Sequence, residues 1–107
     1  MKYYIGVDLG GTNVRVARVS EQGQIVKVIK EATEIQQGVE HVLDKIIRMI
    51  EEIGELDTIS GIGMGVPGPV DTDNGVMMLA TNLPGFEGYP MAETIRKHFN
   101  IPVFADN

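Results

Sequence analysis

Asp8-Leu9-Gly10-Gly11-Thr12-Asn13 is the stretch that sets the fold, because it joins two runs of different hydrophobic pattern. Before it, the apolar run Tyr4-Ile5-Gly6-Val7 predicts a strand. After it, Val14-Arg15-Val16-Ala17-Arg18-Val19 alternates apolar and polar residues, as a half-buried returning strand does. The stretch is therefore expected to be a tight turn between two antiparallel strands, at residues 3–8 and 14–19.

Spacing alone leaves two interpretations of this turn open. In the first, the glycines adopt positive φ and let backbone N–H groups approach an anion, while Thr12 and Asn13 donate to phosphate oxygens. Asp8 at the strand end would then hold a hydrated Mg²⁺, which takes oxygen ligands and keeps several waters. In the second, the stretch is a Gly-Gly hairpin turn that carries a solvated acid.

Composition limits the kind of protein. The 107 residues are 43% hydrophobic, enough for the core of one small domain or of part of a larger one. A net charge of −6 without any basic run argues against binding to nucleic acid or to an anionic membrane. The lack of cysteine excludes disulfides and Cys-based zinc sites here and is compatible with a reducing cytosol.

Localisation follows from what the sequence lacks. No apolar stretch reaches the roughly 18–20 residues of a membrane span. No signal peptide precedes the first predicted strand. We therefore expect a cytoplasmic protein without a membrane partner.

The rest of the chain continues the pattern of strands and then adds helices. A third strand is predicted at 25–29, a glycine-rich buried strand at 59–66, a long loop at 67–89 and a last strand at 101–105. Apolar residues at helical spacing predict a helix that ends before Gly54. They are Val39, Val42, Leu43, Ile46, Ile47, Ile50 and Ile53. Pro90 is expected to open a second helix, which ends near Phe99 with Asn100 as its cap.

This β-β-β-α-β-α-β order predicts an α/β fold with a mixed five-stranded sheet, covered by helices. The final strand has no element after it to cover it. We therefore expect that the segment is cut from a longer chain and that an apolar face of the sheet is exposed.

Two motifs in the glycine-rich region are expected to be misleading. Gly63-Met64-Gly65-Val66-Pro67-Gly68 matches the dinucleotide fingerprint, but the prolines prevent the helix that this motif must open. Asp71-Thr72-Asp73-Asn74-Gly75 resembles a calcium loop, yet its glycine is misplaced and the bidentate glutamate is absent. It is interpreted as a hairpin turn.

Three segments together resemble one family. Ile5–Asn13 resembles the first phosphate motif of the sugar kinase/Hsp70/actin superfamily. Gly63–Asp71, followed by Asn82–Phe86, resembles the ROK family and especially its bacterial glucokinases. Pro102–Asn107 resembles the strand that leads into that family's acidic-Asn-Asp-Ala-Asn motif.

The resemblance implies an RNase H-like, actin-like ATPase half-domain, in which residues 1–107 form the N-terminal lobe. It further implies transfer of the ATP γ-phosphate to the 6-hydroxyl of glucose with Mg²⁺. Carried over by position, Asp8 would organise the Mg²⁺ through water. The ATP phosphates would contact Gly10, Gly11, Thr12 and Asn13, and the sugar would contact Gly68, Pro69, Thr81, Asn82 and Asn107.

The chain also departs from the family pattern. The general base of the family is the Asp directly after the Asn, which would follow Asn107 and is not in this sequence. The family's zinc motif, adenosine pocket and further sugar ligands belong to the lobe that this sequence lacks. The segment is therefore expected to have no useful kinase activity on its own.

Two other functions stay open at this point. ROK proteins include sugar-responsive transcriptional repressors, although the first strand begins near Tyr3 without a DNA-binding domain before it. Alternatively, the segment is a self-associating half-domain without enzymatic role, and a symmetric homodimer would mimic the two lobes of the parent fold. The sequence decides neither the hexose nor whether polyphosphate replaces ATP.

Overall fold

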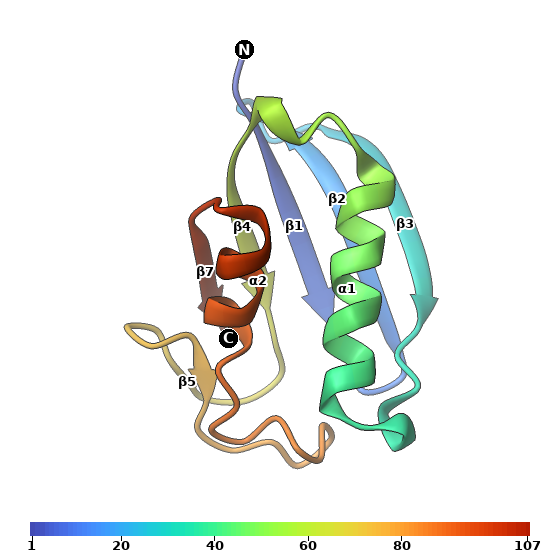
Figure 1. Ribbon diagram of the computed structural model, residues 1–107, viewed down its shortest axis with the longest axis vertical. Coiled ribbons are helices and arrows are strands. Elements are labelled where there is room, and N and C mark those ends of the chain that lie inside the picture. Colours follow the sequence, from blue (N-terminus) through green and yellow to red (C-terminus); the bar gives the residue numbers. More distant parts are fainter.

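The computed structural model describes all of residues 1–107 as a twisted sheet with two helices on one face (Figure 1). The sheet has five strands in the order β3-β2-β1-β4-β7. The strands are β1 (Tyr3–Leu9), β2 (Asn13–Ser20), β3 (Ile25–Ala32), β4 (Ile59–Gly65) and β7 (Val103–Asp106). The helices are α1 (Val39–Ile53) and α2 (Met91–Phe99), with short 3₁₀ turns η1 (Ile35–Gln37) and η2 (Leu56–Thr58).

The sheet is mixed, as the sequence predicts. β1, β2 and β3 form an antiparallel meander, whereas β4 runs parallel to both β1 and β7. Each parallel connection carries a helix, because parallel neighbours cannot be joined by a short turn. The predicted order of β-β-β-α-β-α-β is confirmed for these elements.

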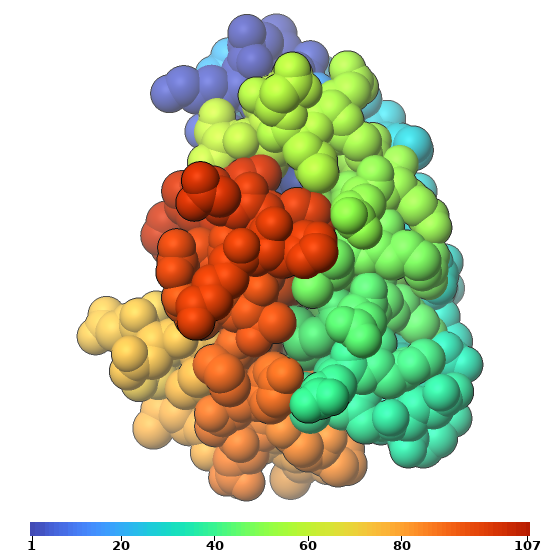
Figure 2. All heavy atoms as spheres, viewed as in Figure 1, coloured from blue at the N-terminus to red at the C-terminus, as the bar shows by residue number.

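The core lies between the sheet and the two helices. Alternation along β1 buries Ile5, Val7 and Leu9 on the helix side. α1 turns its apolar stripe onto them, with Ile46 and Ile50 fully buried. Figure 2 shows α1 and α2 packed side by side over this face, so little of the sheet is visible there.

The ends of the helices follow the predicted signals. α1 ends at Ile53, and Gly54 adopts a φ of 77°, which glycine adopts at little cost. α2 ends at Phe99, and Asn100 caps it in the left-handed region. Neither helix has the length and apolar character that a membrane-spanning helix needs.

Two strand boundaries differ from the prediction by two residues or more, and the others lie within one residue of it. β3 extends to Ala32, three residues beyond the predicted end, because Lys30 and Glu31 remain paired with β2 although they break the apolar pattern. β7 begins at Val103 rather than at position 101, after Pro102, which has no N–H to donate to a ladder.

The loop at 67–89 is more ordered than its sequence suggests. It contains a two-stranded hairpin of β5 (Val70–Asp71) and β6 (Val76–Met77), so the predicted hairpin turn is confirmed. Leu83 and Phe86 are fully buried and fix the second half of the loop to the core. No helix begins after the glycine-rich β4, which confirms that its GxGxxG pattern is not a dinucleotide fingerprint.

The face of the sheet opposite the helices is uncovered, as expected. Tyr4 on β1, Val28 on β3 and Phe104 on β7 are exposed large hydrophobic residues. Between them lies a shallow groove over the glycines of β1 and β4, Gly6, Gly61 and Gly63. Because these three glycines have no side chains, backbone atoms form the floor of the groove.

Candidate functional site

A cleft of about 400 Å³ lies at the carboxyl ends of β1 and β4, the edge where open α/β sheets bind ligands. The β1–β2 turn forms one wall and the loop after β4 forms the other. The lining residues are Asp8, Leu9, Gly10, Gly11, Gly65, Val66, Pro67, Asn82 and Asn107. They come from four separate parts of the sequence, which the fold brings together.

The β1–β2 turn presents backbone donors. The Gly10 amide donates to the Asn13 carbonyl at 3.0 Å, but the Gly11 and Thr12 amides have no acceptor within the chain. Unpaired N–H groups in a turn are a common site for anions. The turn therefore offers two adjacent hydrogen-bond donors to a phosphate group.

The expected role of the glycines in this turn is partly wrong. Neither Gly10 nor Gly11 has positive φ. Glycine is favoured at position 11 because of space, since a Cβ there would lie 3.0 Å from the Asn82 carbonyl oxygen and would have to displace it slightly. The loop after β4 thus lies directly against the turn, and a second hollow is lined by Gly11, Thr12 and Asn82.

The end of β7 is tied to the same loop. The Asn107 side chain donates from Nδ2 to the Gly68 carbonyl at 2.5 Å. Gly68 has a φ of 103°, and a Cβ there would lie 2.8 Å from the Leu79 carbonyl oxygen. No other residue fits this position without moving the loop, which explains the glycine after Pro67.

Two carboxylates flank the cleft on the uncovered side of the sheet. Asp8 on β1 and Asp106 on β7 both pair in register with Gly65 on β4. The Asp8 side chain is 74% exposed, and its nearest cation is Arg15 Nη1 at 3.9 Å. A pair this exposed contributes little to stability, so the Asp8 carboxylate is available to a ligand.

No group of three or more acidic or histidine side chains forms a metal cage in this chain. Mg²⁺ is usually held by one or two carboxylates together with substrate phosphates. The single carboxylate of Asp8 beside the unpaired amides of Gly11 and Thr12 fits that arrangement. Asp8 would hold the ion, and the turn would hold the phosphates.

The structure brings together some of the predicted site residues. Asp8, Gly10, Gly11, Asn82 and Asn107 line the cleft, and Thr12 lines the adjoining hollow. The others lie outside the lining. Asn13 begins β2, the Gly68 and Pro69 carbonyls accept hydrogen bonds from Asn107 and Met78, and Thr81 is exposed beside Asn82.

Sequence reasoning missed one residue that contacts the turn. Thr33 follows β3 and is completely buried. Its Oγ1 donates to the Gly10 carbonyl at 2.7 Å, and its amide donates to the Thr12 carbonyl at 2.9 Å. A lone threonine between a strand and a helix has no periodicity or spacing that would indicate this contact.

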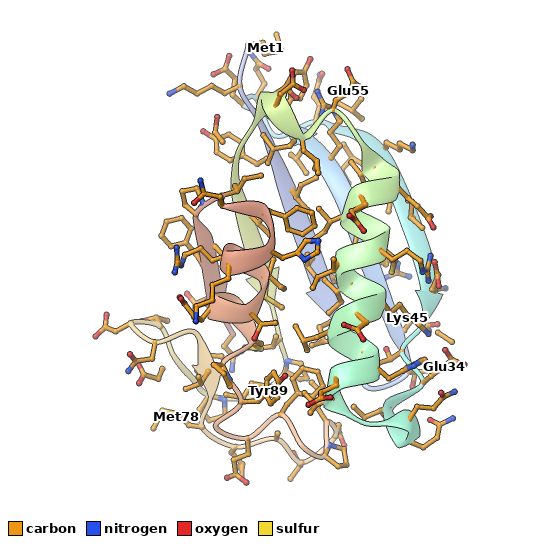
Figure 3. All side chains as sticks on the ribbon, in the orientation of Figure 1. Met1, Glu34, Lys45, Glu55, Met78 and Tyr89 are labelled. Carbon is orange, nitrogen blue, oxygen red and sulfur yellow. The ribbon has the colours of Figure 1, made fainter.

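A charged cluster includes Glu34, which follows Thr33 in the chain, and Lys45 on α1, both labelled in Figure 3. The Lys45 ammonium on α1 donates to the Ala32 carbonyl at 2.6 Å and to the Glu34 carboxylate. His41 Nε2 lies 3.2 Å from the same carboxylate. The hydrogen bond from Lys45, followed by that from His41, lowers the pKa of Glu34 below its ordinary value.

The chain is similar to known proteins over nearly its whole length. The sequence matches the ROK family over residues 4–107. The glucokinase of Thermotoga maritima is 35% identical over 103 residues, which are 96% of this chain and 32% of that protein. A putative xylose repressor from a Caldicellulosiruptor species is 30% identical over 108 residues, covering 96% of this chain and 27% of that protein.

Solved structures show the same fold. The crystal structure of a ROK family glucokinase from Streptomyces griseus, in complex with glucose and AMPPNP, matches with a TM-score of 0.87 and 28% identity. The match covers 98% of this chain and 33% of that one. The fold is thus that of the ROK sugar kinases, as the expected actin-like ATPase class requires.

The chain spans about a third of the length of the curated glucokinases that it matches. The match to the family begins at residue 4 and includes every strand and helix described above except the first residue of β1. The chain therefore belongs to the ROK family.

Proposed function

We propose that residues 1–107 form the N-terminal lobe of an ATP-dependent glucokinase, which transfers the ATP γ-phosphate to the 6-hydroxyl of glucose. One observation carries this proposal. Gly11, with its unpaired amide, lines one cleft with Asn82 and Asn107, and the unpaired Thr12 amide lies in the adjoining hollow beside Asn82, so donors for a phosphate and for a sugar are close together.

The residues of the cleft suit phosphoryl transfer, which depends on positioning and on charge neutralisation more than on covalent chemistry. The turn amides would hold the phosphates of ATP. The side chains of Asn82 and Asn107 each carry an acceptor and a donor, which sugar hydroxyls need. Mg²⁺ held by Asp8 would neutralise charge on the phosphates.

Neither the proposed phosphate contacts nor the proposed sugar contacts require a large movement of the chain. Asn107 is already held by the Gly68 carbonyl, and the Asn82 backbone already lies against Gly11. Preorganised groups lose less entropy when a substrate binds. The sugar and phosphate contacts would therefore be in place before ATP or glucose arrives.

The proton from the sugar hydroxyl needs a general base, and no residue in the cleft lining is assigned this role. We propose that the base is the residue that follows Asn107 in the full-length protein. Residues 1–107 would then bind parts of both substrates without completing the reaction. We also propose a cytoplasmic location.

The relatives support glucose as the substrate. The Thermotoga maritima protein is a glucokinase, and the Streptomyces griseus structure is a complex with glucose and AMPPNP. The segment Asn82–Phe86 lies in the loop that crosses Gly11, where it would contact the sugar.

A coupled assay with ATP and a panel of hexoses tests the proposal on the full-length protein. We expect turnover that needs Mg²⁺ and is fastest with glucose, while the 107-residue chain alone gives none. Replacement of Asn82 by alanine should raise the KM for the hexose. A full-length protein that transfers no phosphate to any hexose would refute the proposal.

A repressor is the second candidate, and the similarity to a putative xylose repressor favours it. A repressor would bind DNA in a sugar-dependent manner and would turn over no ATP. A mobility-shift assay with operator-containing DNA, run beside the kinase assay, separates the two functions.

A further inference from the structure

Thr33 holds the β1–β2 turn, residues 10–13, through two hydrogen bonds. It lies between the end of β3 and η1, and none of its surface is exposed. Its hydroxyl and its amide reach two carbonyls of the same turn, those of Gly10 and Thr12. No other side chain donates to these two carbonyls.

The direction of these two carbonyls fixes the direction of the N–H group that follows each of them. In a trans peptide the C=O and the following N–H point in opposite directions. The chain has no cis peptide, so the Gly11 N–H points away from Thr33 because the Gly10 carbonyl points toward it. In the same way, the Thr12 carbonyl points toward the Thr33 amide, so the Asn13 N–H points away from Thr33.

The hydroxyl also replaces a bond that a two-residue hairpin turn normally forms. In such a turn the amide of the fourth residue donates to the carbonyl of the first. Here the Asn13 amide makes no bond to the Gly10 carbonyl, and Thr33 Oγ1 takes that acceptor instead. The turn is therefore held open by a residue outside it.

Thr33 is itself firmly placed. The Lys45 side chain, only 8% exposed, donates to the Ala32 carbonyl before Thr33 and to the Glu34 carboxylate after it. Glu34 adopts a left-handed φ of 58°. Figure 3 shows Lys45 extending from α1 toward Glu34, so α1 fixes the position of Thr33 through its two neighbours.

We propose that Thr33 is a positioning residue for ATP, which aims the Gly11 amide at the phosphates through its hydrogen bond to the Gly10 carbonyl. This inference rests on the proposed kinase function. It concerns the nucleotide and not the sugar, because the bonds of Thr33 reach the turn and not Asn82 or Asn107.

The test compares Thr33→Ala with Thr33→Ser in the full-length kinase. Both variants lose the methyl group, so the difference between them reports the hydroxyl alone. We expect Thr33→Ala to raise the KM for ATP about tenfold, the usual scale of one hydrogen bond, with the KM for glucose changed by less than about twofold. Thr33→Ser should restore the KM for ATP.

Thr58 offers a matched control at the opposite end of the sheet. Its hydroxyl donates to the Glu55 carbonyl at 2.7 Å and accepts from Arg18 Nη2 at 2.8 Å. Thr58→Ala should lower the melting temperature and leave both KM values unchanged. If Thr33→Ala does not fold at the assay temperature, Thr33→Val takes its place, because it keeps the branched side chain without the hydroxyl.

The outcomes separate this inference from the proposed function. Equal KM values for ATP in Thr33→Ala and Thr33→Ser, in an active kinase, overturn the positioning role and leave the kinase proposal intact. A parallel rise of the KM values for ATP and glucose also overturns it, since that result indicates a structural role. A wild-type protein without hexose kinase activity overturns both proposals.

Discussion

Gly11 and Asn82 are in contact across the cleft although 71 positions separate them in the sequence. A Cβ on Gly11 would lie 3.0 Å from the Asn82 carbonyl oxygen and 3.4 Å from its Cβ. The turn that we propose for phosphate binding and the loop that we propose for sugar binding thus share one surface. A change at either residue is transmitted to the other.

Gly11→Ala is expected to reduce the proposed kinase activity of the full-length protein toward both substrates. The added methyl group must push the Asn82 backbone or the turn by a few tenths of an ångström, because backbone atoms lie in its way. Small misplacements of reacting groups are costly, so we expect kcat/KM to fall by at least about tenfold for ATP and for glucose. Steady-state kinetics with each substrate varied in turn measure this.

Gly23→Ala is a suitable control for this variant. Gly23 lies in the β2–β3 turn with a φ of 86°, so alanine is strained there, but nothing lies within 4 Å of the added Cβ. It should lower the melting temperature without changing either KM. Wild-type kinetics in the Gly11→Ala variant would show that the close contact between Gly11 and Asn82 is not required for activity.

Asn107→Ala is expected to loosen the loop after β4. Without the donor from Asn107 Nδ2, the Gly68 carbonyl loses its partner in the chain. The Met78 amide, which donates to the Pro69 carbonyl at 2.9 Å, should then exchange faster with solvent deuterium. Amides in the middle of α1 serve as the internal reference. Unchanged exchange at Met78 would mean that the loop is held by its buried residues alone.

The sequence predicts the architecture well because hydrophobic period and turn residues act locally. The alternation around Asp8–Asn13 and the helical spacing before Gly54 each depend on a few neighbouring residues. Contacts such as that of Thr33 with Gly10 depend on how distant segments meet, and no local pattern encodes them. The glycine at position 11 is visible in the sequence, but its reason, the Asn82 backbone, appears only in three dimensions.

Phe86→Ala tests whether the loop at 67–89 is part of the core. Phe86 is fully buried together with Leu83, although both stand in a segment without regular structure. Removal of a buried phenylalanine side chain should lower the free energy of unfolding by about 3–5 kcal/mol. Met78→Ala, at a residue that is 62% exposed, should change it by less than about 0.5 kcal/mol. Urea denaturation of both variants gives the comparison, and similar small losses would argue for a loosely attached loop.

The Glu34–Lys45 pair predicts a dependence of stability on pH. The pKa of Glu34 is lowered from 4.5 in the folded chain, chiefly by the hydrogen bond from Lys45. Because the folded pKa lies below the unfolded one, the charged carboxylate stabilises the fold above about pH 4.5. This contribution is lost as the pH falls through the lower folded value.

The comparison of wild type with Glu34→Gln isolates this effect, since other lowered carboxyl pKa values, such as that of Asp71, also reduce stability in acid. The difference in melting temperature between the two proteins should be largest near neutral pH and should shrink as the pH falls below about 4.5, the ordinary glutamate value. In a Lys45→Met background the Glu34→Gln effect should be smaller, because only the contact with His41 then remains to favour the charged carboxylate. A pH-independent difference would show that the lowered pKa of Glu34 does not contribute to stability.

The uncovered face of the sheet predicts self-association of the 107-residue chain. Phe104 and Val28 are 68% and 55% exposed on this face, and the glycine groove between them is open to a second copy. A symmetric dimer through this face would bury both residues on both copies. We expect sedimentation velocity at high micromolar concentration to show dimers, and Phe104→Glu to shift the population toward monomers, because charge would be buried at the contact. Met78→Glu places the same charge on an equally exposed apolar residue of the loop at 67–89 and should leave association unchanged. A wild-type chain that sediments as a single monomeric species would rule out association through this face.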